Sequence, residues 1–169
     1  MIRKAENIDQ DVDLYHQLWT DPDVMKFVGF PKGLRISKEM IREKMLQQPI
    51  SEFDSLLLVE MKENGELIGE AKLGFPNKLK ISKTDIKLLP KFWKRGFGKE
   101  IKLALVDYIF KKTYAVAVEG SPNKKNIASI RMQKSIGAKK ISKSVYHFPE
   151  SMRSYTEDVH CVIYYICRK

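Results

Sequence analysis

The sequence predicts an α+β domain built on a mixed, mostly antiparallel sheet that is flanked by helices. Apolar residues recur at helical spacing in the first third of the chain, and a hairpin signal follows in the middle. A strand, a glycine loop, a helix and another strand come next, and this order requires one parallel strand pair. The 169 residues contain no linker or internal repeat, so we treat residues 1–169 as a single domain.

Helices are expected before the first strand. Leu14, Tyr15, Leu18 and Trp19 fall on one helical stripe. The run Asp21-Pro22-Asp23 is typical of an N-cap followed by proline at the first helical position. Ser37 could cap a third helix that carries Met40, Ile41 and Met45.

Strands are expected in the middle of the chain. The apolar runs 56–59 and 67–69 flank Asn64-Gly65, and Asn-Gly between such runs is a strong hairpin signal. A third strand is expected over residues 79–89, because the chain then reaches Pro90, which cannot donate to a sheet ladder.

The next segment predicts a βαβ unit. Ile101, Leu105, Tyr108 and Ile109 have the spacing of an amphipathic helix, and residues 114–118 form a short apolar run. The strands on either side of that helix should be parallel and joined by a right-handed crossover. A helix over residues 126–136 should end at Gly137, and the tail, residues 139–169, reads as two strands around a loop centred on Pro149.

Composition excludes several classes of protein. Lys and Arg number 31 against 21 Asp and Glu, so the net charge is +10 and the chain should attract polyanions. Cys161 and Cys167 would lie about 20 Å apart on one strand, too far for a disulfide, and we expect both to be small buried residues. We expect no metal centre, no membrane span and a cytoplasmic location, because no zinc-ligand spacing, signal segment or long apolar run occurs.

A glycine loop separates the third strand from the following helix. Without side chains at Gly96 and Gly98, backbone N–H groups can approach a ligand, and a helix N-terminus attracts anions. Lys94, Arg95 and Lys99 add positive charge, which suits a pyrophosphate, although an ordinary turn is the other interpretation. The dinucleotide and P-loop patterns do not match this loop.

A second polar site begins the next helix. Asn126 and Ser129 lie one turn apart, where they can bond a polar ligand or simply cap the helix. Ligands of sheets with parallel strands lie beyond the strand C-termini, where this segment and the glycine loop converge.

Three separated motifs resemble the GNAT superfamily of N-acetyltransferases. Residues 88–100 are similar to its motif A, Gln/Arg-x-x-Gly-x-Gly/Ala, with Trp93 at the Gln/Arg position. That tryptophan resembles the branch of the ribosomal-protein N-terminal acetyltransferases. Residues 126–131, followed by Gly137, are similar to that branch's Asn-x-x-Ser-Ile-Arg motif. Residues 21–27 are similar to its Asp-Pro-x-Val-Met signature.

The resemblance implies a site for acetyl-coenzyme A between two splayed strands, here residues 80–89 and 114–119. The backbone of Leu88 and Leu89 would pair with the pantetheine and acetyl group and supply an oxyanion donor. Asn126 would bond the pantetheine arm, and Ser129 would lie near the phosphates. The implied pyrophosphate-binding residues are Lys94, Arg95, Gly96, Phe97, Gly98 and Lys99.

The family reaction is direct attack of a neutral amine on the thioester, which requires loss of a proton and protonation of the leaving thiolate. Glu70 and Asp85 are the candidate catalytic carboxylates, although strand carboxylates are commonly just solvated. Gln133 stands where many members carry a tyrosine as general acid, so Tyr146, Tyr155 or solvent could serve instead.

The sequence therefore predicts an acyltransferase that moves an acetyl group from acetyl-coenzyme A, without a metal, to a primary amine of a small molecule or protein N-terminus. The alternative is a catalytically weak module of the same fold that binds RNA, a ribosome or an acidic partner through its basic surface. We do not expect nucleic acid as the partner, because the lysines are scattered along the chain. Whether two copies form a homodimer stays open.

Overall fold

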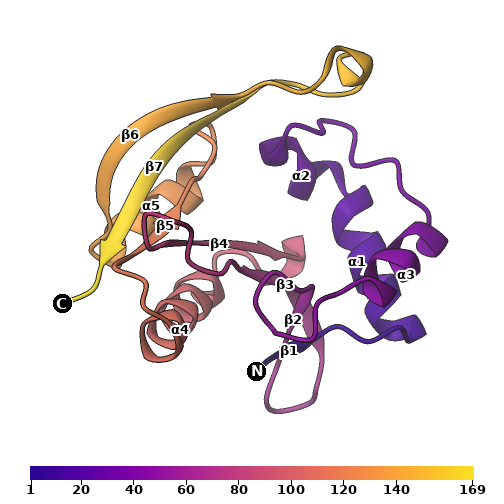
Figure 1. The fold of residues 1–169 in the computed structure, drawn as a ribbon. Coiled ribbons are helices and arrows are strands. Elements are labelled where there is room, and N and C mark those ends of the chain that lie inside the picture. Colours follow the sequence, from indigo (N-terminus) through magenta and orange to yellow (C-terminus); the bar gives the residue numbers. More distant parts are fainter.

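A computed structural model describes all residues, 1–169, and places a seven-stranded sheet between two groups of helices (Figure 1). The strands are β1 (Ile2–Lys4), β2 (Leu57–Glu60), β3 (Leu67–Leu73), β4 (Ile81–Leu88), β5 (Ala117–Gly120), β6 (Lys139–Tyr146) and β7 (Val159–Cys167). The helices are α1 (Asp9–Thr20), α2 (Pro22–Met25), α3 (Lys38–Leu46), α4 (Phe97–Lys112) and α5 (Ile127–Ser135), with short 3-10 turns η1 (Lys26–Val28), η2 (Pro90–Phe92) and η3 (Glu150–Met152).

The sheet has the order β1-β2-β3-β4-β5-β7-β6. Every neighbouring pair is antiparallel except β4 and β5, which are parallel. In Figure 1, α1 to α3 lie together beside β1 to β4, α4 and α5 lie apart from them, and the β6–β7 ribbon arches toward α2. The predicted α+β domain with a mixed sheet and one parallel strand pair is confirmed.

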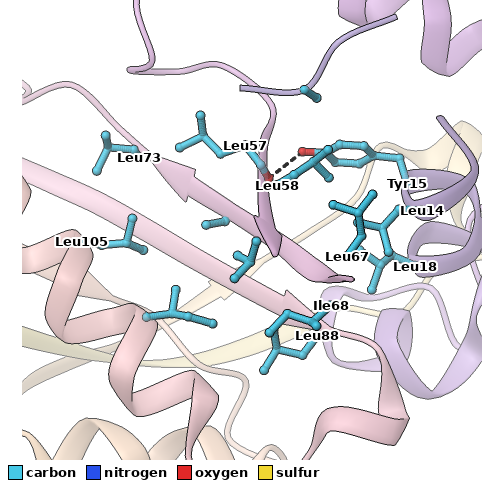
Figure 2. Close-up of a cluster of buried hydrophobic side chains, with 14 of the residues drawn as sticks. Leu14, Tyr15, Leu18, Leu57, Leu58, Leu67, Ile68, Leu73, Leu88 and Leu105 are labelled. Atoms are coloured by element: carbon cyan, nitrogen blue, oxygen red, sulfur yellow. Dashed lines mark hydrogen bonds between the residues drawn. The ribbon is translucent and has the colours of Figure 1, made fainter. Parts of the chain in front are cut away.

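Buried hydrophobic side chains pack against both faces of the sheet (Figure 2). Leu14 and Leu18 of α1 pack on one side, and Leu105 of α4 approaches from the other. Each such buried side chain contributes about 1.5–3 kcal/mol. The Tyr15 hydroxyl, also buried, donates to the Leu57 carbonyl at 2.9 Å, so α1 is tied to the sheet backbone as well as packed against it.

Capping residues predicted from the sequence occur at the helix starts. The Asp21 side chain accepts a hydrogen bond from the Asp23 N–H at α2, and the Ser37 hydroxyl accepts one from the Met40 N–H at α3. Gly137 ends α5 with φ of +78°, the left-handed conformation that favours glycine. Local side-chain chemistry therefore sets these boundaries.

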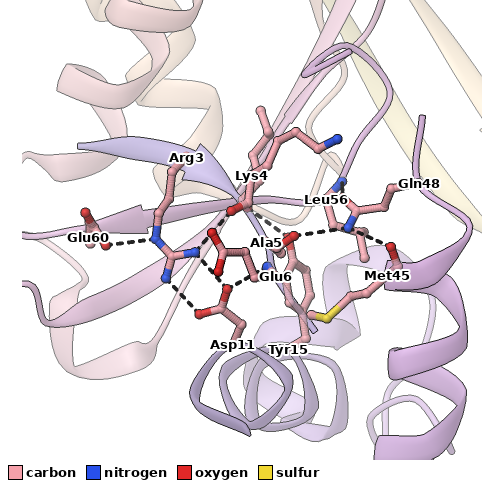
Figure 3. Close-up of polar contacts among 11 residues, drawn as sticks. Arg3, Lys4, Ala5, Glu6, Asp11, Tyr15, Met45, Gln48, Leu56 and Glu60 are labelled. Carbon is pink, nitrogen blue, oxygen red and sulfur yellow. Dashed lines mark hydrogen bonds and ion pairs between the residues drawn. The ribbon is translucent and has the colours of Figure 1, made fainter. Parts of the chain in front are cut away.

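Strand β1 was not predicted, and a charged cluster holds it in place (Figure 3). The Arg3 guanidinium donates to both carboxylate oxygens of the fully buried Asp11, at 2.7 and 2.8 Å, and to Glu60 at 3.1 Å. The Glu6 N–H also donates to Asp11. These bonds connect the N-terminus, α1 and β2.

Two other predictions need correction. Strand β5 begins at Ala117 rather than Tyr114, because Tyr114 and Val116 are exposed and β5 runs on to Gly120. The two cysteines are free as expected, but Cys161 is only half-buried and Cys167 is exposed, so they are not small core residues. No helix combines the length and the apolar character needed to cross a membrane.

Candidate functional site

A wedge opens between the two parallel strands. Strands β4 and β5 pair only where residues 81–83 meet residues 117–119. Beyond Lys83, β4 continues to Leu88 with β3 as its only strand neighbour on that stretch. The sheet therefore presents an unpaired strand edge in its middle, with the apex of the wedge at Thr84.

Alternate residues of β4 direct their backbone groups into the wedge. The Leu89 N–H donates to Ile68, and the Gly74 N–H donates to Lys83, so odd-numbered residues of β4 face β3. The N–H and carbonyl groups of Ile86 and Leu88 therefore face the wedge. Leu89 follows Leu88 at the end of β4, but both of its backbone groups already have partners within the protein. Its N–H donates to the Ile68 carbonyl, and its own carbonyl accepts from the Phe92 N–H.

Trp93 already uses one of these wedge groups. Its indole Nε1 donates to the Leu88 carbonyl at 2.7 Å. The N–H of Leu88 and both backbone groups of Ile86 remain for a ligand in the wedge, because a strand edge offers unpaired donors and acceptors. The tryptophan thus covers the end of β4.

The glycine loop leads into α4 with an open backbone. Gly96 has φ of +86° and Lys94 has φ of +59°, so the chain turns through left-handed conformations before the helix. The backbone N–H groups of residues 94–98 donate to no protein acceptor. A Cβ placed on Gly98 would have no atom within 4 Å. Such a concave row of free N–H groups suits an anion.

Positive charge surrounds this loop. Lys94, Arg95 and Lys99 are all exposed beside the free N–H groups. The Arg95 guanidinium lies over the rings of Phe92 and Phe97, with its central carbon 5.6 and 5.1 Å from their centroids. This stacking restrains Arg95 near the helix start, where its charge adds to that of the helix dipole.

Helix α5 presents polar groups from the side of β5. Asn126 is its N-cap, and its side-chain Oδ1 accepts a hydrogen bond from the Ser129 N–H at 3.1 Å. The predicted capping interpretation of Asn126 is therefore confirmed. The Gln133 side chain is buried, and its Oε1 has no hydrogen-bond partner. It packs so closely on Gly120 that a Cβ there would lie 2.3 Å from its Nε2.

The two candidate carboxylates, Glu70 and Asp85, lie on the face of the sheet that α1 covers, and both contact the same lysine. Lys87 lies between them: its Nζ is 2.9 Å from Glu70 Oε1 and also bonds Asp85. Trp19 of α1 donates its indole N–H to the same Glu70 oxygen at 3.0 Å. Glu70 is buried, whereas Asp85 is half-exposed beside the wedge.

The shared lysine keeps this trio charged. Partial burial of Asp85 disfavours its ionised form, but the Lys87 ammonium outweighs that effect and holds the pKa of Asp85 below its usual range. Burial likewise disfavours the Lys87 ammonium, but Asp85 and Glu70 outweigh it and raise the pKa of Lys87. Ionised Asp85 therefore favours the folded state above about pH 4, and this contribution is lost as the pH falls further.

Two charged residues near the wedge were missed by sequence reasoning. Glu119 of β5 is buried, and its Oε1 is 3.2 Å from Lys83 Nζ. Lys102 of α4 is fully buried at the apex of the wedge. The signal for Lys102 was present, because it precedes Val106 by four residues and Ile109 by seven, on an otherwise apolar stripe.

The tyrosines considered as general acids belong to the tip of the β6–β7 ribbon. Tyr146 is exposed and packs edge-on against Phe148, and the Tyr155 ring lies under the Arg35 guanidinium. Phe148 in turn packs on the buried Phe30, so the ribbon tip closes against the segment after α2. No group of three His, Cys, Asp or Glu side chains is placed to hold a metal ion.

Comparison with known proteins gives consistent matches. The family model described as "Acetyltransferase (GNAT) domain" matches residues 1–139. An "Uncharacterized N-acetyltransferase p20" of Bacillus licheniformis is 25% identical over 146 residues, which cover 82% of this chain and 78% of that protein.

Solved structures share the fold. An acetyltransferase of the GNAT family from Bacillus anthracis has a TM-score of 0.78 at 21% identity and covers 98% of this chain and 93% of its own. The spermidine N-acetyltransferase of Vibrio cholerae, solved with CoA and spermine, has a TM-score of 0.78 at 19% identity and covers 99% and 94%. Identities this low establish a shared architecture rather than a shared substrate.

Proposed function

Since the chain belongs to the GNAT family of acetyltransferases, we propose that it transfers the acetyl group of acetyl-coenzyme A directly to a primary amine. One observation carries the proposal: an unpaired edge of β4 leads to a helix start with free N–H groups and open space over Gly98. These features fit a long ligand with an anionic end and an amide-bearing arm. The more specific ribosomal-protein branch stays a prediction.

On the cofactor side, every predicted residue except Leu89 has a proposed role. The N–H groups of residues 94–98 and the charges of Lys94, Arg95 and Lys99 would hold the pyrophosphate. Leu88 and Ile86 would pair with the arm through the wedge, and Ile86 takes the place expected for Leu89. Asn126 would bond the arm from the start of α5, and Ser129 would lie near the phosphates.

The acceptor side suits an amine. The half-exposed Asp85 would attract an incoming ammonium. Glu70, which accepts a hydrogen bond from Trp19, holds Lys87 between the two carboxylates. After the ammonium loses its proton to water, the neutral amine attacks the thioester carbonyl carbon. The family match favours this transferase over the module that binds RNA or an acidic partner.

Binding and thiol release together test the proposal. At 100 times its Kd, acetyl-coenzyme A should stabilise the protein by about 2.7 kcal/mol, which raises Tm by about 5–10 °C. S-acetyl-N-acetylcysteamine, a thioester without the pyrophosphate, should not raise Tm. Free thiol should then appear with one class of amine among polyamines, peptide N-termini, aminoglycosides and amino acids. No Tm shift with millimolar acetyl-coenzyme A would exclude the function.

Asp85→Asn tests the acceptor side. The substitution removes a half-exposed charge that attracts an ammonium, so we expect KM for the amine to rise about 5-fold with little change in kcat. The pH profile of kcat/KM should keep its shape, since the pKa of Asp85 lies below its usual range and Asp85 stays ionised near neutral pH. Asp107→Asn, at an exposed position on α4, is the matched control. An unchanged KM in Asp85→Asn would remove Asp85 from amine binding.

A further inference from the structure

Lys102 places an ammonium group inside the protein at the apex of the wedge. The residue is 1% exposed, and its Nζ donates to the Thr84 hydroxyl and, at 3.4 Å, to the Glu119 carbonyl. Thr84 is the first β4 residue beyond the paired segment, and Glu119 is the last β5 residue within it. Lys102 therefore marks the point at which the two strands part.

This position is costly for a charged side chain. An ammonium has three N–H donors, and Lys102 has two acceptors here, one of them distant, and no carboxylate in hydrogen-bond contact. Its neighbours in α4, Ile101, Leu105 and Val106, are buried and apolar. A methionine would fill the same space without a buried charge. The third donor has no acceptor within the protein and is free to bind a group that enters the wedge.

The geometry of the proposed cofactor site brings the reacting sulfur to this apex. The pyrophosphate site lies at the start of α4, just after the C-terminal end of β4. An arm that pairs with Leu88 and then Ile86 runs backward along β4 toward Thr84, over roughly 13 Å for four residues. The thioester at the end of that arm therefore approaches the apex, where Lys102 lies.

We propose that Lys102 Nζ donates the proton that the coenzyme A thiolate takes up when the acetyl group leaves. This inference rests on the proposed function. The amine nitrogen forms a bond to the acetyl carbonyl carbon, the carbon–sulfur bond breaks, and the sulfur receives a proton from Lys102. The surplus proton on the nitrogen leaves to water, and water returns a proton to Lys102.

The chemistry of Lys102 suits that step. Burial lowers its pKa to about 8, against the opposing charges of Asp85 on β4 and Glu119 on β5, so it is mostly protonated at pH 7 yet can release the proton. A thiol has a pKa of about 8.5, so donor and acceptor are closely matched. Gln133, the buried side chain that α5 presents to Gly120, cannot donate a proton.

A titration of bound coenzyme A tests the contact without turnover. In the wild-type complex, thiolate absorbance should appear at a lower pH than for free coenzyme A, because the Lys102 ammonium favours the thiolate. In Lys102→Met, the bound thiol should titrate at least about one pH unit higher than in wild type. The variant should be no less stable than wild type, since it loses a buried charge. Lys111→Met, on the exposed end of α4, is the matched control.

Kinetics separate proton donation from charge alone. Lys102→Met should lower kcat by roughly 10- to 100-fold with KM for acetyl-coenzyme A unchanged. The loss of activity above about pH 8 that we expect for the wild type should be absent in this variant. Lys102→Arg keeps a charge that does not release its proton, so the thiolate shift should return without recovery of kcat. The inference would be overturned if Lys102→Met bound coenzyme A and kept both the thiol titration and the kcat of the wild type. A wild-type protein that does not bind coenzyme A would overturn the proposed function and this inference with it.

Discussion

Replacing Gly98 with phenylalanine is expected to weaken acetyl-coenzyme A binding at least about 100-fold while leaving the fold intact. The added side chain would occupy the open space beside the free N–H groups of the glycine loop. Hydrogen bonds to a charged group contribute about 1.5–3 kcal/mol each, so the loss of two raises Kd at least about 100-fold. Calorimetric titration measures this change directly.

Stability should hardly change in Gly98→Phe. Gly98 lies in the first turn of α4 with nothing within 4 Å of a Cβ, and glycine is a poor helix former. Lys111→Phe adds the same ring at the other end of the same helix and should bind acetyl-coenzyme A as wild type does. If Gly98→Phe kept wild-type affinity, the pyrophosphate could not lie against this backbone.

Asp11→Ala is expected to destabilise the fold more than any other single carboxylate change. It leaves the Arg3 guanidinium without its bidentate partner and the Glu6 N–H without an acceptor (Figure 3). Breaking a pair with one fully buried partner costs about 3 kcal/mol, and Tm should fall by about 6–12 °C. Thermal unfolding followed by circular dichroism measures the loss.

Asp13→Ala is the matched control for that change. Asp13 lies two residues further along α1 and pairs with Lys38, but both side chains of this pair are about half-exposed. Its removal should change stability by no more than about 0.5 kcal/mol. Equal losses for the two variants would mean that burial of the Arg3 pair contributes nothing to its strength.

Sequence reasoning found the elements that carry strong local signals. The Asn64-Gly65 hairpin, the caps at Asp21 and Ser37 and the glycine loop depend on residues that are neighbours in the chain. Strand β1 was not predicted because three residues are too few to show a periodicity. The contacts that hold this strand in place are made by Arg3 with Asp11 and Glu60, which lie elsewhere in the sequence. Long-range charge pairing cannot be read from local pattern.

The candidate site divides in the same way. The cofactor loop is contiguous in sequence, so its residues could be named together. The pairing of Glu70 with Lys87 follows from the register of β3 and β4, in which those two residues are Cα partners, and no spacing in the sequence fixes that register. Lys102 lies on the apolar stripe of α4, but it was missed because a lysine is ordinarily assigned to the solvent face.

The short parallel pairing of β4 and β5 has a consequence for local unfolding. The main hydrophobic cluster lies around α1, α3, α4 and β2 to β5. A separate cluster of three residues forms at the C-terminal ribbon, with Val162 and Tyr164 from β7 and Ala138 just before β6. Segments with few buried contacts open at a lower free energy than the rest of a protein. The C-terminal ribbon, which contacts the N-terminal part at its tip through Phe148 and Phe30, should therefore open at a lower free energy than the N-terminal part. A ligand bound across the wedge would join the two, so they would unfold as one cooperative unit.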